Sequence, residues 1–84
     1  MPAPAEELRV LVEEVVCPLI DSPDELEVTS SEEGSDVLIE ISVDPDDAGK
    51  VIGRQGRVIK SIRTLARAAA TRKGLNVDVE LLDD

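Results

Sequence analysis

The middle of the chain reads Val51-Ile52-Gly53-Arg54-Gln55-Gly56-Arg57-Val58-Ile59, and the arrangement of the other elements follows from this segment. Apolar residues on both sides of it have helical spacing, so two helices meet across the four residues Gly53 to Gly56. Glycine permits positive φ and carries no side chain that would hold a ligand away from the backbone. The helix that begins at Arg57 directs its free N–H groups and its positive dipole end toward this turn. The spacing therefore predicts a loop that binds phosphate through backbone amides.

The basic residues gather around this loop. Residues 48–77 hold eight Lys and Arg side chains and no acidic one, for a charge of +8. Residues 1–47 (charge −14) and 78–84 (charge −4) bring the total to −10. Because charges act over about a Debye length, ~8 Å at physiological salt, a basic face can attract phosphate on an acidic protein. A plain preference of helices for Lys and Arg is the alternative, but it does not explain thirty positions without a carboxylate.

Apolar periodicity predicts two amphipathic helices and a short helical turn. The first helix covers residues 5–17, with an apolar stripe made of Leu8, Leu11, Val12, Val15, Val16 and Leu19. A helical turn over 48–52 precedes the glycine loop. A longer helix runs from Arg57 to a C-terminal cap at Gly74. Its apolar stripe consists of Val58, Ile59, Ile62, Leu65, Ala66 and Ala69.

Alternation of apolar and polar residues predicts three strands, over 25–30, 37–43 and 77–82. Residues 31–35, between the first two strands, are typical of a loop or a hairpin turn. Asp44 or Asp46 suits a cap for the helical turn that follows the second strand. Each strand has one apolar and one polar face, as a two-layer domain requires.

The predicted order is helix, strand, strand, short helix, helix, strand. We expect an α+β fold in which a three-stranded sheet carries three helices on one face. At 84 residues the chain has room for a single domain, residues 1–84, with its core motif over 48–73.

Residues 51–59 resemble the Ile-Gly-x-x-Gly-x-x-Ile core of the KH domain, an RNA-binding module. The element order is that of the type II form, in which an extra helix and strand precede the core. The segments 49–53, 63–65 and 68–70 are similar to those of small, stand-alone bacterial KH proteins, the KhpA family. The resemblance covers essentially the whole chain and is most specific between residues 49 and 70.

The resemblance implies a function for individual residues. The backbone clamp on RNA would consist of Gly53, Arg54, Gln55 and Gly56. Ile52 would lie on the floor of the groove that holds the bases. The candidate phosphate or base contacts are Lys50, Arg57, Lys60 and Arg63. Bases would rest on aliphatic side chains, so the absence of aromatic residues does not count against RNA binding.

Other interpretations stand beside these roles. The two glycines could form an ordinary turn between helices. Three cations could equally form a solvated helix face: Lys60, Arg63 and Arg67. Arg72 and Lys73 are better explained by the helix C-terminus. Cys17 is expected to be a small apolar residue, buried or half-buried.

Composition argues against several chemistries. The chain has no His and a single Cys, which excludes His-based catalysis and a thiolate zinc site. The Gly49-Lys50 pair does not fit a Walker loop, because Asp44 stands where its first glycine should be. We therefore expect no enzymatic activity, no catalytic or metal site, no cofactor and no small-molecule substrate. Neither a signal peptide nor a membrane span is evident, so we expect a cytoplasmic protein.

The sequence thus predicts a single-stranded RNA-binding protein of low sequence specificity, acting as an RNA chaperone or post-transcriptional regulator. One clamp of about four nucleotides has modest affinity, so a second copy would raise avidity. The resemblance implies a homodimer, a heterodimer with a KhpB-like KH protein, or both. The alternative is a protein-interaction subunit whose acidic half docks on a larger RNA-binding or ribosome-associated partner.

Overall fold

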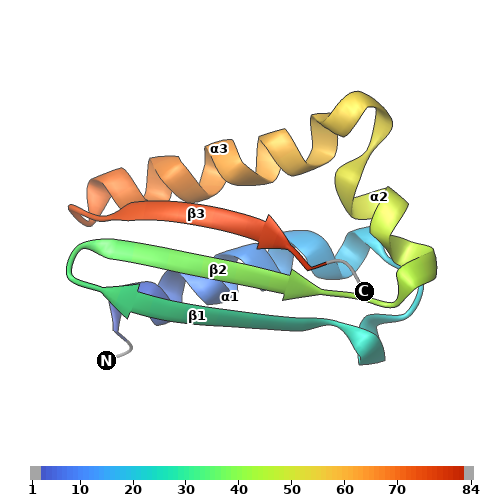
Figure 1. Cartoon of the computed structure of the whole chain (residues 1–84), viewed down its shortest axis with the longest axis horizontal. Coiled ribbons are helices and arrows are strands. Elements are labelled where there is room, and N and C mark those ends of the chain that lie inside the picture. Colours follow the sequence, from blue (N-terminus) through green and yellow to red (C-terminus); the bar gives the residue numbers. More distant parts are fainter. Residues whose placement is uncertain (1–2, 83–84) are drawn as a thin grey trace.

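A computed structural model describes residues 3–82, in which a three-stranded mixed sheet carries three α-helices on one face (Figure 1). The helices are α1 (Pro4–Val16), α2 (Ala48–Ile52) and α3 (Arg57–Arg72), and the strands are β1 (Glu27–Glu33), β2 (Asp36–Ser42) and β3 (Asn76–Leu81). The short 3₁₀ turns are η1 (Cys17–Leu19), η2 (Pro23–Glu25), η3 (Pro45–Asp47) and η4 (Arg54–Gly56). The predicted α+β class and element order are confirmed.

Strand β2 lies at the centre of the sheet, antiparallel to β1 and parallel to β3. The register places apolar residues of neighbouring strands beside one another, as in the pairs Val28–Ile41 and Ile39–Val79. The buried strand residues are Val28, Val37, Ile39, Ile41, Val77 and Val79. Helices α1 and α3 cover this face with Leu8, Val12, Val16, Ile59, Ile62 and Ala66. The core is wholly aliphatic, as the composition predicts.

Two side chains that the helical pattern assigns to the interior are exposed, and so is Cys17, which was expected to be buried or half-buried. Leu19 is 38 % exposed, Leu65 is 51 % exposed, and Cys17 is also exposed. Helix α1 ends at Val16, and the tighter η1 turn rotates the following side chains off its apolar stripe. Helix α3 faces the core along Ile59, Ile62, Ala66 and Ala70. Leu65 lies about 100° from Ala66 around the helix axis and therefore points outward.

The hairpin between β1 and β2 is tighter than the polar composition suggests. Strand β1 continues to Glu33, which pairs with Asp36, so the predicted hairpin turn is present but begins after residue 33 and not after residue 30. Gly34, at φ 61°, allows the two strands to join through a short turn. The polar residues near this end of β1 extend the ladder because an edge strand needs no apolar side chain there.

A buried carboxylate ties α2 to the turn that follows α1. The side chain of Asp47 is 1 % exposed and accepts hydrogen bonds from the backbone N–H groups of Asp21 (3.1 Å) and Ser22 (3.0 Å). It also accepts one from Lys50 Nζ at 3.1 Å. Neither predicted cap, Asp44 or Asp46, caps α2: Asp44 accepts a hydrogen bond from Asp46 N at 2.9 Å and caps the η3 turn. The base of the glycine loop is thus anchored by Asp47, which the sequence pattern did not distinguish from its acidic neighbours.

Burial raises the pKa of Asp47, but the backbone donors of Asp21 and Ser22, together with Lys50, outweigh it and hold the pKa below its usual value of 3.8. A carboxylate with a lowered folded-state pKa stabilises the fold above its unfolded-state pKa. That contribution is lost as pH falls through the folded-state pKa.

We expect Asp47→Asn to lower the Tm by roughly 5 °C or more at neutral pH, because an amide cannot accept all three hydrogen bonds. Between about pH 5 and pH 2 the wild-type Tm should fall more steeply than that of the variant, since only the wild type loses the charged acceptor. Thermal unfolding followed by circular dichroism measures both. Asp24→Asn, at an exposed position of η2, is the matched control. Equal pH slopes for Asp47→Asn and wild type would contradict the assignment.

Candidate nucleic-acid interface

The four residues between α2 and α3 are Gly53 and the three residues of the tight 3₁₀ turn η4. Positive φ occurs at Gly53 (76°), Gln55 (58°) and Gly56 (73°). The N–H of Gly53 donates to Gly49 O at 2.8 Å, and the N–H of Gly56 donates to Gly53 O at 3.2 Å. The prediction that glycines permit positive φ here is confirmed. A positive φ at Gln55 costs free energy, and such strained residues concentrate at functional sites.

The two glycines serve different purposes. A Cβ at Gly53 would lie 2.3 Å from Val58 Cγ2 and 2.9 Å from Val58 N, so the start of α3 packs directly on this backbone. A Cβ at Gly56 would meet no heavy atom of the described residues within 4 Å. Gly53 is therefore required by the junction of the two helices. Gly56 leaves open space beside the backbone, which is where a ligand could approach.

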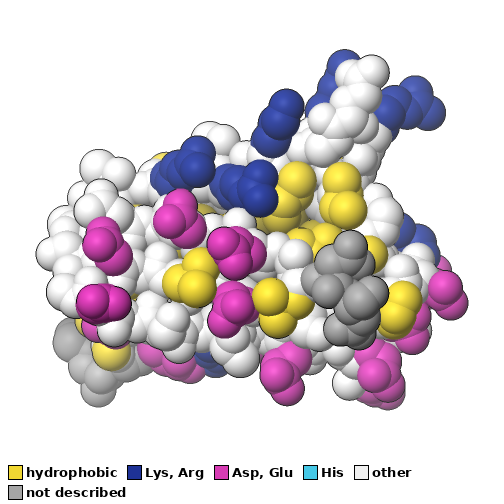
Figure 2. Space-filling view, viewed as in Figure 1, with side chains coloured by type: hydrophobic (Ala, Val, Ile, Leu, Met, Phe, Trp, Pro, Cys, Tyr) yellow, Lys and Arg dark blue, Asp and Glu magenta, His cyan; other side chains and the backbone are white. Residues whose placement is uncertain are grey.

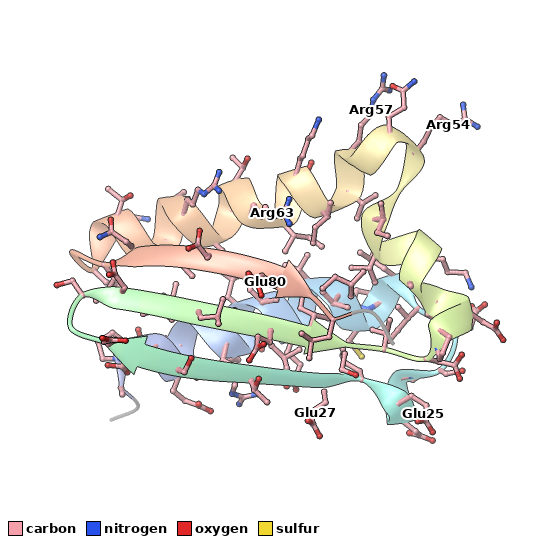
Figure 3. All side chains as sticks on the ribbon, viewed as in Figure 1. Glu25, Glu27, Arg54, Arg57, Arg63 and Glu80 are labelled. Carbon is pink, nitrogen blue, oxygen red and sulfur yellow. The ribbon has the colours of Figure 1, made fainter. Side chains whose placement is uncertain are left out.

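Arginines project from the exposed end of this loop. Arg54 and Arg57 extend away from the body of the protein (Figure 3). Arg57 Nη2 donates to Gln55 Oε1 at 3.2 Å, which links the loop to the first turn of α3. Among residues 3–82, ion pairs involve the cations Arg9, Lys50 and Lys73 alone. The cations of the loop are thus available to an external anion.

Lys50 differs from these arginines. Its ammonium donates to Asp21 Oδ2 at 2.7 Å and to Asp47 Oδ1 at 3.1 Å. The hydrogen bond to Asp21, followed by that to Asp47, raises the pKa of Lys50 above its usual value. Lys50 therefore lies at the base of the loop in a structural network. It would have to exchange these carboxylates for a phosphate to contact RNA.

A seam between α3 and β3 continues from the loop. Arg63 Nε donates to Val79 O at 3.1 Å, so the guanidinium crosses from the helix to the free edge of the sheet (Figure 3). Arg63 is half-buried and hydrogen-bonded, which contradicts a merely solvated role. Arg63 follows the buried Ile59 by four residues, which places it beside the apolar stripe of α3. Ile52, 41 % exposed at the end of α2, adds an apolar surface close to the loop.

Acidic side chains occupy the opposite face of the sheet. The alternation of the strands directs six carboxylates to this open face: Glu27, Glu33, Asp36, Glu40, Asp78 and Glu80. Glu40 and Glu80 are cross-strand partners, so like charges lie side by side. In the space-filling view, basic side chains gather over the loop and α3 and acidic ones over the sheet (Figure 2). The charge separation predicted along the chain is therefore also a separation between surfaces.

Metal and membrane features are not found in the described chain. Residues 3–82 contain no group of three or more His, Cys, Asp or Glu side chains placed to hold a metal ion. None of the helices described is long and apolar enough to cross a membrane.

An α-β-β-α-α-β chain with a Gly-x-x-Gly turn between its second and third helices defines a type II KH domain. The family model described as "KhpA/KhpB, KH domain" matches residues 9–81. The chain belongs to this family, as the sequence resemblance predicted.

Curated relatives cover nearly the whole chain. The RNA-binding protein KhpA of Halalkalibacterium halodurans is 42% identical over 76 residues, which is 90% of this chain and 100% of the relative. The protein of the same name from Clostridium acetobutylicum is 40% identical over 75 residues, 89% of this chain and 100% of the relative. That from Bacillus subtilis is 38% identical over 78 residues, 93% of this chain and 96% of the relative. All three organisms are bacteria.

Solved structures support the fold. Aquifex aeolicus Era bound to GDP.AlF4- superposes with a TM-score of 0.63 at 22% identity. Era in complex with MgGDPNP and nucleotides 1506–1542 of 16S ribosomal RNA superposes with a TM-score of 0.65 at 23% identity. In both cases the match covers 100% of this chain and 33% of the Era chain, so the whole chain corresponds to one part of Era.

The two glycines of the loop should differ sharply on substitution. We expect Gly53→Ala to lower the free energy of unfolding by about 3–5 kcal/mol, because a Cβ would overlap the backbone of Val58 at a φ that only glycine adopts readily. Gly56→Ala should cost about 1–2 kcal/mol, from the left-handed conformation alone. Urea denaturation measures both values. Similar losses for the two variants would show that the junction at Gly53 is not tightly packed.

Proposed function

We propose that this protein binds single-stranded RNA and holds its sugar-phosphate backbone with the loop Gly53, Arg54, Gln55 and Gly56. The observation that carries the proposal is the glycine-flanked turn at the basic end of an otherwise acidic protein, whose arginines belong to none of the ion pairs among residues 3–82. The curated relatives are named RNA-binding proteins, and Era was solved with a segment of ribosomal RNA. KH domains clamp about four nucleotides with such a loop.

The chemistry of the clamp is electrostatic and does not depend on base identity. A phosphate beside Gly56 would meet the N-terminal dipole of α3 and the guanidinium groups of Arg54 and Arg57. Lys60, exposed one turn further along α3, would contact the next phosphate. Lys50 would contribute by exchanging Asp21 for the RNA. Binding should therefore weaken steeply as salt rises.

Bases would lie along the seam between α3 and β3. Ile52 provides an aliphatic surface on which a base can rest, and Arg63 presents the remaining N–H donors of its guanidinium near Val79. An apolar surface with one cation distinguishes bases weakly, which supports low sequence specificity. The proposed biological role is that of an RNA chaperone or post-transcriptional regulator in the cytoplasm, without enzymatic activity.

A single clamp has modest affinity, so we propose that the protein acts as a homodimer, as a heterodimer with a KhpB-like KH protein, or both. The family name joins KhpA with KhpB, which supports a partner of that kind. Two linked clamps raise avidity without any new contact to RNA. Sedimentation equilibrium, alone and with a KhpB-like protein, should show a species larger than the monomer; a monomer in both samples would contradict the proposal.

The clamp is tested by the double variant Arg54→Asp/Gln55→Asp. We expect its affinity for short single-stranded RNA to fall by about a hundredfold at low salt, because two carboxylates replace a phosphate-binding cation and an amide. Fluorescence anisotropy with a labelled oligoribonucleotide measures the change. Ala68→Asp/Arg72→Asp makes the same change in net charge at exposed positions near the other end of α3 and is the control. If the loop variant folds and binds RNA like wild type, the clamp is refuted.

A second candidate function is that of a protein-interaction subunit. The observation in its favour is the row of carboxylates on the open face of the sheet, which suits a basic partner. The same loop variant separates the two functions. Loss of RNA with retention of a protein partner in pull-down experiments would place both functions on separate surfaces. Retention of RNA would leave the interaction role as the better account.

A further inference from the structure

The seam between α3 and β3 contains a hollow at the end opposite the glycine loop. Its volume is about 230 Å³, and its lining residues are Arg67, Thr71, Leu75, Asn76 and Val77. Pockets for drug-sized ligands measure roughly 300–1,000 Å³, so this hollow suits a group the size of one or two rings. The sequence left Arg67 undecided between RNA contact and solvated surface and assigned no role to Asn76 or Thr71.

The hollow offers both donors and acceptors above apolar walls. Among residues 3–82, the guanidinium of Arg67 belongs to none of the ion pairs. Asn76 Nδ2 donates to Asp36 Oδ1 at 3.1 Å, which directs its amide nitrogen to the carboxylate and leaves the amide oxygen as an acceptor. Thr71 Oγ1 donates to Arg67 O at 2.9 Å and keeps lone pairs that can accept.

This chemistry fits a nucleobase better than a phosphate. A phosphate presents only acceptors and would require a site made of donors. The edge of a base carries donors and acceptors together, and its faces are apolar enough to rest on aliphatic side chains. The walls formed by Leu75 and Val77 meet that second requirement. The carboxylate of Asp36, held beside the hollow by Asn76, would also repel a phosphate.

The hollow lies on the side of α3 that Arg63 occupies, further from the loop. Arg63 and Arg67 are one turn apart on α3, and Thr71 follows at the same interval, so all three lie on one side of the helix. Arg63 contacts β3 at Val79, and Arg67 lines the hollow together with the earlier residue Val77. From Gly56 to Arg67 the helix rises about 16 Å. The hollow is thus separated from the loop but continuous with the seam.

We propose that the hollow lined by Arg67, Thr71 and Asn76 binds the base of a nucleotide that flanks the four held at the loop. The proposal rests on the proposed RNA-binding function and extends it. The protein would read a segment longer than the clamp alone, and a base at the far end of the seam would contribute to affinity. The ligand of this subsite is a single-stranded nucleobase, recognised by hydrogen bonds along its edge.

Two oligoribonucleotides with the same number of phosphates test the proposal. One is an octamer with a base at every position; the other keeps four central bases and carries abasic nucleotides on both flanks. We expect wild type to bind the full octamer about tenfold more tightly in at least one of the four homopolymer series, because hydrogen bonds to a charged group are lost with the flanking base. Equal affinities in all four series would overturn the proposal, whatever any variant does.

The variants Arg67→Gln and Asn76→Ala should each reduce this preference for the full octamer while leaving the affinity for the abasic-flanked one within about threefold. Arg72→Gln removes the same charge from the same helix but lines a different hollow, and it should retain the preference. Loss of the preference in Arg72→Gln, or its retention in Arg67→Gln and Asn76→Ala, would overturn the proposal. If Arg54→Asp/Gln55→Asp also binds the abasic-flanked octamer normally, the clamp itself fails. If the loop variant loses binding but wild type binds the full and the abasic-flanked octamers equally well, the clamp stands and only the inference about the hollow fails.

Discussion

The close approach of Gly53 to the start of α3 is the contact on which the other features depend. Because the side chain and backbone N of Val58 occupy the space where a Cβ would lie, α2 and α3 are joined by only four residues and the chain turns sharply within η4. This turn leaves the loop projecting from the end of the molecule. It also lays the length of α3 along β3, where Arg63 reaches the edge of the sheet. The glycine loop and the seam are therefore two consequences of one packed junction.

The charged side chains are divided between two surfaces of the molecule. The basic residues lie on α3 and its loop, and the open face of the sheet carries carboxylates, including the adjacent pair Glu40 and Glu80. Like charges directly opposite one another destabilise a sheet by a few tenths of a kcal/mol to about 1 kcal/mol. The arrangement favours the helical side for a polyanion, because the Debye length of ~8 Å keeps each surface electrostatically distinct. A net charge of −10 is thus compatible with a basic binding surface.

Most of the fold could be predicted because its cause is local. The alternation in 37–43 and the helical stripe around Leu8 and Ile59 each determine an element and its buried face. The predictions of burial that failed have a common cause, because each depends on how one element packs against another. Leu65 has the same chemistry as the buried stripe, and only the rotation of α3 against the sheet exposes it. Asp47 is chemically equivalent to Asp44 and Asp46, and its burial depends on donors 25 and 26 residues away.

The sequence by itself determined the element order, the glycine loop and the segregation of charge, because spacing, backbone freedom and composition are properties of neighbouring residues. It also marked the loop residues as the candidate site. Only the tertiary structure decided that Lys50 is held by Asp21 and Asp47, that Arg63 reaches Val79, and that Arg67 and Asn76 line one hollow. Each of these relations joins residues from different elements. Their distances arise when the helices pack on the sheet, so no local pattern encodes them.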